Sequence, residues 1–488
     1  MKKRLCMLLT VSLLAACVLP VSAAARDLTI TNPYAAVDWD AWDAYKTQLH
    51  CHTTASDGFL TIREVIQKHY DYDYDIVAVT DHGTLNRGWD TAPQLIPLLR
   101  AVKKERTKMA PVVPLTAAEY AAFRDGSATP TDGFVRTHET GMLDVPLGVE
   151  LNMATPFADC HLTGYFSEYG QGLAGVFGDY ETPVQGVREA GGLSMLSHVG
   201  EYVYPKKDSE KHVGQPVDDY YANKFARIFL DNPGSCVGMG INSATDAHTR
   251  CDRILYDQIL RKTIPNGVVP WAFCFADSHN NTSINDAYTM MLLPELTLDA
   301  FRTGMENGTF FAVSHFTYGV ELNGMQEMSG FVEEDMDWRS NATPMVTRVT
   351  VDEARDRITV ECENADSITW ISDGNVICRA PVENGRAQIG LHDGDLLSPV
   401  RTFVRFYITG RDGICYSQPF TVCPAGETFK PVDVPKTRDV STRLRTLVTV
   451  LDWAIFKWSP VVWAFKYFAL GYDPLERLGT DILRLFRR

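Results

Sequence analysis

Two histidines one residue apart, His50 and His52, are followed within a few positions by an aspartate, Asp57. Alternate residues of a strand face the same side, so both imidazoles should project from one strand end toward one point. A turn rich in threonine and serine then brings the carboxylate of Asp57 within reach. Imidazole and carboxylate ligands together suit zinc, manganese or iron. The segment predicts a metal site, although a His-x-His pair alone does not distinguish such a site from packed or exposed histidines.

Further residues that commonly bind metals recur along the chain in or directly after short apolar runs. These residues are His82, Glu150, His161, His198, Asp277 and His279. Only 12 histidines are spread over 488 residues, so their repeated placement at predicted strand ends indicates one shared site rather than unrelated positions.

The elements that would position these residues alternate between strands and helices. The expected helices are residues 61–70, 91–108, 184–189, 252–262 and 296–307, and the expected strands are residues 45–49, 75–80, 112–115, 147–151, 160–166, 192–198, 237–242 and 268–276. Chemistry at the carboxyl ends of strands that alternate with helices is typical of an α/β barrel. Residues 121–145, rich in Gly, Thr, Asp and Pro, are expected to form a long excursion from it.

The composition indicates a folded protein, because 45% of the residues are hydrophobic and 22% are charged. The formal net charge of −15 argues against a protein that wraps nucleic acid, since phosphate backbones are bound by clustered Lys and Arg. It does not exclude a small phosphorylated substrate, because bound metal cations would supply local positive charge.

Residues 316–425 change in character. Short runs of β-branched and aromatic residues lie at 346–351, 357–362, 367–371 and 403–408, with Gly- and Asp-containing turn signals between them. They predict a small antiparallel β-sandwich. Its expected role is structural, packed against the barrel; the alternative is binding of polymer or cell-surface material.

The first 25 residues have the pattern of a secretory signal peptide: Lys2, Lys3 and Arg4, an apolar run, and small residues at 21–23. An alternative is processing as a lipoprotein, because residues 14–17 resemble a lipobox that ends in Cys17. Both predict an exported protein that works outside the cytoplasm.

The chain has 11 cysteines, and export would permit disulfides among Cys362, Cys378, Cys415 and Cys423. Cys51 lies between two candidate ligands and should point to the opposite face of its strand, so we interpret it as a packing residue. No CxxC pair occurs, which disfavours a thiolate zinc site.

Residues 426–488 begin as a linker and continue, from residue 441, as an apolar and aromatic tail with interspersed basic residues. The tail fits a helix that contacts a membrane surface, or equally a helical pair packed against the protein itself.

Taken in order, the candidate segments resemble the PHP family, the polymerase and histidinol phosphatase domain superfamily. The resemblance is carried by His50-Cys51-His52, Ser56-Asp57-Gly58, Val79-Thr80-Asp81-His82, Gly148-Val149-Glu150, the run from His161 to Phe166, Leu196-Ser197-His198 and Ala276-Asp277-Ser278-His279. It covers roughly residues 45 to 315 and implies a distorted seven-stranded (β/α) barrel with two or three metal ions. We therefore expect a signal peptide at 1–25, a barrel at 26–315, a β-sandwich at 316–425 and a linker with helical tail at 426–488.

The resemblance also implies how the ligands group. One metal would be held by His50, His52, Asp277 and a bridging Glu150; a second by Glu150, His161 and His198; and a third by Asp57, His82 and His279. Asp81 is expected to orient an imidazole without binding metal. Asp277 and His279 could alternatively supply a general acid to the leaving oxygen, and Arg87 could clamp a phosphate.

The predicted function is metal-dependent hydrolysis of a phosphate ester, with a metal-bridged hydroxide as nucleophile and two or three divalent ions, zinc, manganese or iron, as cofactors. The expected partner is a small phosphorylated substrate, with nucleic acid disfavoured and with membrane-surface contact through residues 441–488. Two alternatives stay open: a non-catalytic binding or scaffolding protein on the same barrel, and a metal-dependent hydrolase of a non-phosphate substrate.

Overall fold

The computed structural model describes residues 27–95, 112–131, 133–154, 159–171, 180–203, 214–243, 251–315 and 342–436. The predicted signal segment with Cys17, most of the helix expected at 91–108 and the tail from residue 441 lie outside the described residues. Within the described part, no helix is both long enough and apolar enough to cross a membrane.

Helix α2, Ile62–Asp71, forms where the sequence predicts it and is fixed at its start by a capping box. The Thr61 hydroxyl accepts the backbone N–H of Glu64, and the Glu64 carboxylate accepts the backbone N–H of Thr61. Ile62, Val65 and Ile66 point inward and pack in the core beside the strand that leads to His82. The apolar face of the helix thereby packs against the segment that precedes His82.

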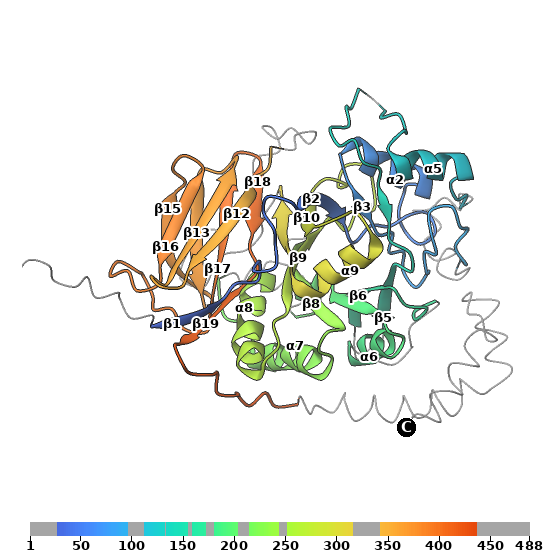
Figure 1. The fold of residues 1–488 in the computed structure, drawn as a ribbon. Helices are drawn as coiled ribbons and strands as arrows, with labels where there is room; N and C mark the ends of the chain where they lie inside the picture. The colour runs from blue at the N-terminus through green and yellow to red at the C-terminus, as the bar shows by residue number, and fades with distance from the viewer. Residues whose placement is uncertain are drawn as a thin grey trace, which may run out of the picture.

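Two sheets carry the candidate ligands, and both are visible in Figure 1. The strands of the first that surround the ligands are β2 (Asp43–Gln48), β3 (Ile76–Val77), β4 (Leu143–Asp144), β10 (Ala287–Leu293) and β11 (Phe310–Ser314). The second runs in the order β5 (Val149–Ala154), β6 (Asp159–Tyr165), β7 (Leu193–Leu196), β8 (Cys236–Ser243) and β9 (Trp271–Phe275). In the first sheet β2, β3 and β4 are parallel, and in the second β7, β8 and β9 are parallel.

Two parallel bridges connect these sheets to each other. Cys51 pairs with Ser278, and His82 pairs with Glu150. Every bridging residue is a predicted ligand or the neighbour of one, so the sheets meet where the candidate site lies. The result is a mixed α/β fold in which carboxyl ends of several strands converge; the barrel of seven strands stays a prediction.

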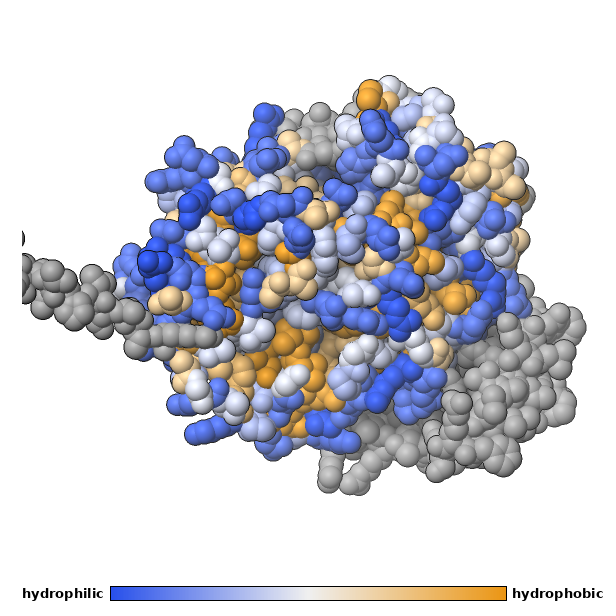
Figure 2. Space-filling view, viewed as in Figure 1, coloured by the Kyte–Doolittle hydropathy of each residue, from blue (hydrophilic) through white to orange (hydrophobic). Residues whose placement is uncertain are grey.

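Helices α6 (Glu181–Glu189), α7 (Asp219–Asp231) and α8 (Asp252–Thr263) cover the second sheet, and α9 (Leu298–Asn307) packs against β10 of the first. The sequence analysis missed α7, although its apolar residues have helical spacing and Phe225, Ala226 and Phe229 are buried in the same core as β7 and β8. In the view of Figure 2, hydrophilic residues predominate on the surface and hydrophobic residues show between them.

Two sequence expectations about the elements were wrong. The strand near 268–276 is not the last one, because β10 and β11 follow it and pair with each other. The excursion at 121–145 contains the end of helix α5, Ala117–Asp125, and all of β4. Strand β5 is followed directly by an antiparallel strand, β6. Only four residues separate β5 from β6, which is too short for a parallel crossover.

The eight described strands of the C-terminal part include the four that the sequence predicts, and they do not pair only with one another. They are β12 (Met345–Asp352), β13 (Arg357–Glu363), β14 (Ser367–Ser372), β15 (Asn375–Pro381), β16 (Arg386–Gly390), β17 (Phe403–Gly410), β18 (Gly413–Tyr416) and β19 (Phe420–Pro424). Strand β18 pairs with β11, and β19 pairs with the first strand, β1 (Leu28–Thr31). One sheet thus crosses the predicted domain boundary at residue 316, while the sandwich architecture stays a prediction.

The cysteines of the C-terminal part are free thiols. Neither Cys362 and Cys415, which are buried, nor Cys378 and Cys423, which are partly exposed, form a disulfide in this structure. The four cysteines lie on four different strands, β13, β15, β18 and β19, none of which pairs with another of the four. Cys51 is also a buried free thiol, which confirms its interpretation as a packing residue.

A buried ion pair fixes the C-terminal strands against helix α8. Nε and Nη2 of Arg405 donate to the two carboxylate oxygens of Asp257, each at 2.7 Å, and both side chains are about 1% exposed. Arg405 lies on β17 and Asp257 on α8, so this bidentate contact joins a C-terminal strand to a helix from the middle of the chain.

We expect Arg405→Met to lower the free energy of unfolding by about 3–5 kcal/mol, because it leaves the Asp257 carboxylate buried without its cation. Chemical denaturation followed by circular dichroism measures this. The control is Arg63→Met, which removes the exposed Arg63–Glu119 pair and should change stability by no more than about 1 kcal/mol. Equal losses in the two variants would contradict the role of the buried pair.

Candidate metal centre

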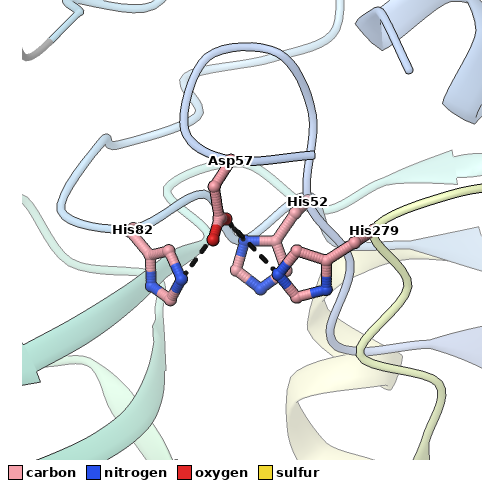
Figure 3. Close-up of side chains that lie close together, drawn as sticks. All are labelled: His52, Asp57, His82 and His279. Carbon is pink, nitrogen blue, oxygen red and sulfur yellow. Dashed lines mark ion pairs between the residues drawn. The ribbon is translucent and has the colours of Figure 1, made fainter. Parts of the chain in front are cut away.

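All nine predicted ligands come together in one cluster. They are His50, His52, Asp57, His82, Glu150, His161, His198, Asp277 and His279. They arrive from the ends of β2, β3, β7 and β9, from the start of β5 and from within β6. Figure 3 shows how His52, Asp57, His82 and His279 converge from separate segments.

Glu150 lies at the centre of the cluster. Its side chain is 1% exposed, and five imidazoles surround its carboxylate. The nearest nitrogens are those of His82 at 2.8 Å, His161 at 2.9 Å, His52 at 3.2 Å, and His50 and His198 at 3.5 Å each. None of these contacts has hydrogen-bond geometry, so both carboxylate oxygens are buried without a hydrogen-bond donor among the described residues.

Asp277 and His279 follow β9 and face the two histidines that follow β2. Oδ1 of Asp277 lies 3.1 Å from Nε2 of His52 and 3.2 Å from Nε2 of His50. Asp277 has φ = 48°, a left-handed conformation that costs free energy for a residue other than glycine. The chain turns sharply here, which directs the carboxylate back into the cluster.

Asp57 forms the other side of the cluster. Its Oδ1 lies 3.3 Å from Nε2 of His279 and 3.4 Å from Nε2 of His82. The turn that brings it there depends on Gly58, because a Cβ at that position would lie 2.6 Å from the backbone oxygen of His52. Glycine therefore lets the loop fold back tightly enough for Asp57 to face the imidazoles.

Several imidazoles are oriented by a hydrogen-bond partner on the nitrogen that faces away from the cluster. Nδ1 of His50 lies 2.7 Å from the Thr80 hydroxyl, and Nδ1 of His279 lies 2.9 Å from the backbone oxygen of Asp277. Such outer contacts fix the ring and its tautomer and leave Nε2 directed at the shared centre.

Asp81, which is predicted to orient an imidazole without binding metal, lies beside the loop that carries Asp57. Its carboxylate accepts hydrogen bonds from the backbone N–H and hydroxyl of Thr53 and from the backbone N–H and hydroxyl of Ser56. It contacts no imidazole directly among the described residues; the link runs through Ser56, whose hydroxyl lies 3.3 Å from Nδ1 of His52. Asp81 thus anchors the loop that carries Asp57.

Charge and burial together set the protonation of the cluster. Burial is the largest influence on His52 and lowers its pKa, but the Asp277 and Glu150 carboxylates outweigh it and raise the pKa to about 9. The same balance raises the pKa of His82 and of His198 well above the usual value. For His50 burial prevails and its pKa is lowered.

The carboxylates respond in the opposite direction. Burial alone would raise the pKa of Glu150, but the surrounding His82, His161 and His50 hold it well below its usual value. For Asp277 likewise, burial is outweighed by His50 and His52, and its pKa is well below the usual value. The centre therefore contains ionised carboxylates that require a positive partner.

The residues fit a cluster of divalent cations. Four sets of side chains have ligand atoms that lie within 4.8 Å of one another: His52, Asp57, His82 and His279; His50, His198 and Asp277; His50, His52 and Glu150; and His82, Glu150 and His161. Nitrogen and carboxylate donors around buried, unsatisfied oxygens suit zinc, manganese or iron.

These sets agree with most of the grouping that the family resemblance implies. Asp57, His82 and His279 lie together, with His52 added, and His50 and His52 lie with Glu150. The difference concerns His161 and His198, which the resemblance places together with Glu150. In the structure His198 groups with His50 and Asp277, and His161 groups with His82 and Glu150.

Arg87 does not stand alone as a phosphate clamp. Its Nη1 donates to Oε1 of Glu168, and its side chain is 33% exposed. The clamp assignment stays a prediction. Sequence reasoning also missed Glu201, which lies three positions after His198 and contacts its ring; a carboxylate one helical turn from a candidate ligand was the available signal.

No protein-family model matches the chain, and no curated protein sequence matches it. Among solved structures, it is similar to a two-domain protein from Bacteroides vulgatus ATCC 8482 containing a predicted PHP-like metal-dependent phosphoesterase, with 14% identity, a TM-score of 0.38, and coverage of 80% of this chain and 98% of that one. It is also similar to the lesion-specific endonuclease PfuEndoQ from Pyrococcus furiosus, with 10% identity, a TM-score of 0.31, and coverage of 60% and 65%. A third is an amidohydrolase from Chromobacterium violaceum, with 14% identity, a TM-score of 0.26, and coverage of 49% and 89%.

We expect metal binding to release protons. Ligand imidazoles must be neutral, whereas in the metal-free protein His52, with a pKa raised to about 9, holds its proton at neutral pH. Affinity for zinc or manganese should therefore fall as pH decreases below about 9, by roughly tenfold per pH unit for each proton displaced. Calorimetry in buffers of different ionisation enthalpy counts the protons. His392→Asn, which removes a half-exposed histidine of the C-terminal part, is the control. A pH-independent affinity would refute the assignment.

Asp81→Ala should weaken metal binding by roughly 10- to 100-fold, because the loop that carries Asp57 loses its anchor. A competition titration with a chromophoric chelator measures the effect. The matched control is Asp71→Ala, because Asp71 holds Thr131 through the same pair of backbone and hydroxyl contacts in another loop. If both variants bind metal as the parent does, Asp81 has no role in the centre.

Proposed function

We propose that this protein is a metal-dependent hydrolase of the PHP type that cleaves a phosphate ester. The observation that carries the proposal is the buried Glu150 carboxylate, which has imidazole nitrogens from five histidines within 3.5 Å. No ordinary structural role needs that arrangement, whereas a bridging carboxylate between cations does. The order of the motifs along the sequence, which resembles the PHP family, supports the same reading.

The donor set suits hydrolysis of a phosphate ester. Bound divalent cations would lower the pKa of water and neutralise charge that develops on phosphoryl oxygens. The chain itself contributes three carboxylates, Asp57, Glu150 and Asp277, whose charge keeps the cations in place. Neither Cys51 nor Ser56 is suited to attack an ester: Cys51 is a buried thiol whose pKa is raised by burial, and the hydroxyl of the buried Ser56 donates to Asp81.

Exposure tells from which side a substrate would approach. The side chains of His50, His52 and Glu150 are almost fully buried, whereas those of Asp277, His279 and His161 are 29%, 25% and 22% exposed. The ester would therefore enter over Asp277, His279 and His161. The low pKa of Asp277 makes it an anionic ligand at neutral pH rather than a proton donor.

The substrate class follows from charge. With a net charge of −15, the protein would attract a small phosphorylated molecule through its cations rather than a long polyanion through its surface. We propose such a substrate and an extracytoplasmic location, and the assays below include an oligonucleotide so that action on nucleic acid becomes a measured outcome.

The test is metal content, by mass spectrometry, of protein purified without chelator, together with hydrolysis of p-nitrophenyl phosphate, its diester and a short oligonucleotide. We expect two or three divalent ions per chain and turnover of at least one ester. Glu150→Gln, which keeps the shape but removes the charge, should lose more activity than the roughly 100-fold that outer contacts of a metal site contribute.

Asp144→Asn is the matched control, because Asp144 is a buried carboxylate outside the cluster that accepts the backbone N–H of Trp89. It should keep metal and turnover. Protein that holds no metal, and that zinc, manganese and iron fail to restore, would refute the metal centre. Full metal content without turnover of any phosphate ester would refute the phosphoesterase assignment alone.

A further inference from the structure

The turn that follows β7 places a carboxylate behind one of the ligand histidines. His198 precedes a short 3-10 helix, η1 (Val199–Tyr202), and has φ = 28°, an unfavourable conformation for a non-glycine residue. This turn brings Oε2 of Glu201 to 3.2 Å from Nδ1 of His198, a buried nitrogen that has no hydrogen-bond partner among the described residues. The other ring nitrogen, Nε2, faces Glu150 at 3.5 Å and Asp277 at 3.7 Å.

This partner differs in charge from the Nδ1 partners of three other ligand rings, whereas Nδ1 of His82 and of His161 faces the candidate ligand Glu150 itself. The closest partner of Nδ1 is a hydroxyl for His50 and for His52, and it is a backbone carbonyl for His279. A carboxylate that accepts the N–H of an imidazole fixes the tautomer and makes the opposite nitrogen a stronger donor to a metal.

Glu201 is placed to act through His198 and not as a ligand itself. None of the four sets of candidate ligands in the described part includes it. Its side chain is 27% exposed, whereas that of His198 is 4% exposed, so it stands on the open side of a buried ring. The neighbouring Tyr202 ring lies 5.2 Å from His161 and 6.3 Å from His198, which limits how far the His198 ring can turn.

We propose that Glu201 is a positioning residue that accepts the Nδ1 proton of His198 and thereby strengthens binding of the ion held by His198, His50 and Asp277. The inference rests on the metal-dependent function proposed above. It predicts that the ions of the cluster are not equivalent, because among the described ligand rings His198 is the one whose ring nitrogen faces a carboxylate that belongs to none of the ligand sets.

The test measures the affinity and stoichiometry of zinc on the full chain by competition with a chromophoric chelator. Glu201→Ala should weaken one ion by roughly 10- to 100-fold and leave the others unchanged. Glu201→Gln keeps an acceptor oxygen without the charge and should fall between the parent and the alanine variant. Glu363→Gln, an exposed carboxylate at the end of β13, is the control and should bind zinc as the parent does.

A double-variant cycle distinguishes positioning from a general structural effect. If Glu201 acts through the imidazole, Glu201→Ala should cause no further loss of zinc affinity in a His198→Ala background. Additive losses would overturn the proposal. So would unchanged zinc affinity in Glu201→Ala, including the case in which only the thermal midpoint of the metal-free protein falls.

The two proposals fail in different ways. Parent protein that binds no metal would refute the proposed function itself. Parent protein that binds two or three ions, with Glu201→Ala binding them equally tightly, would overturn only the role of Glu201. Because the readout is metal affinity, the result does not depend on which ester the enzyme cleaves.

Discussion

A single buried carboxylate, Glu150, sets the constraint that the rest of the structure meets. An ionised group with no hydrogen-bond donor on either oxygen is costly in a protein interior unless cations compensate it. Asp277 and Asp57 add two more negative charges beside it, and the imidazoles that surround all three are donors that a divalent cation accepts. The fold is therefore arranged around negative charge that protonated imidazoles balance in the metal-free protein and that divalent cations would balance once bound.

The backbone beside the cluster adopts strained conformations and tight turns that bring these groups together. His198 and Asp277 both have positive φ values, and each lies two residues after the end of a strand, β7 and β9 respectively. Gly58 allows a turn that any Cβ would block. Asp81 then holds the same loop through Thr53 and Ser56. Local strain and loop anchoring thus occur next to the cluster, as is typical where function outweighs local stability.

The gathering of the nine candidate ligands could be predicted from the sequence, because most of them lie in or next to apolar runs and their order resembles that of the PHP family. Helix α2 was predictable for a similar reason, since its cap and apolar spacing are local. Tertiary relations were not: the antiparallel return of β6, the pairing of β11 with β18, and the partners of Asp81 and Arg405 all depend on residues distant in sequence. Periodicity reports which face is apolar, and it does not report what that face will touch.

The pairing of β1 with β19 has a consequence for the order of folding. Leu28 lies opposite Pro424, so β1, the first described strand, has its pairing partner only after the chain has been synthesised through β19. Contacts this distant in sequence are slow to form, because a long loop must close before they contribute. The strands at 342–425 are therefore not a separate unit that is added after the preceding part of the chain has folded. They complete a sheet that begins at the other end of the chain, and a nascent protein released before residue 424 would present an open edge that favours association with other chains.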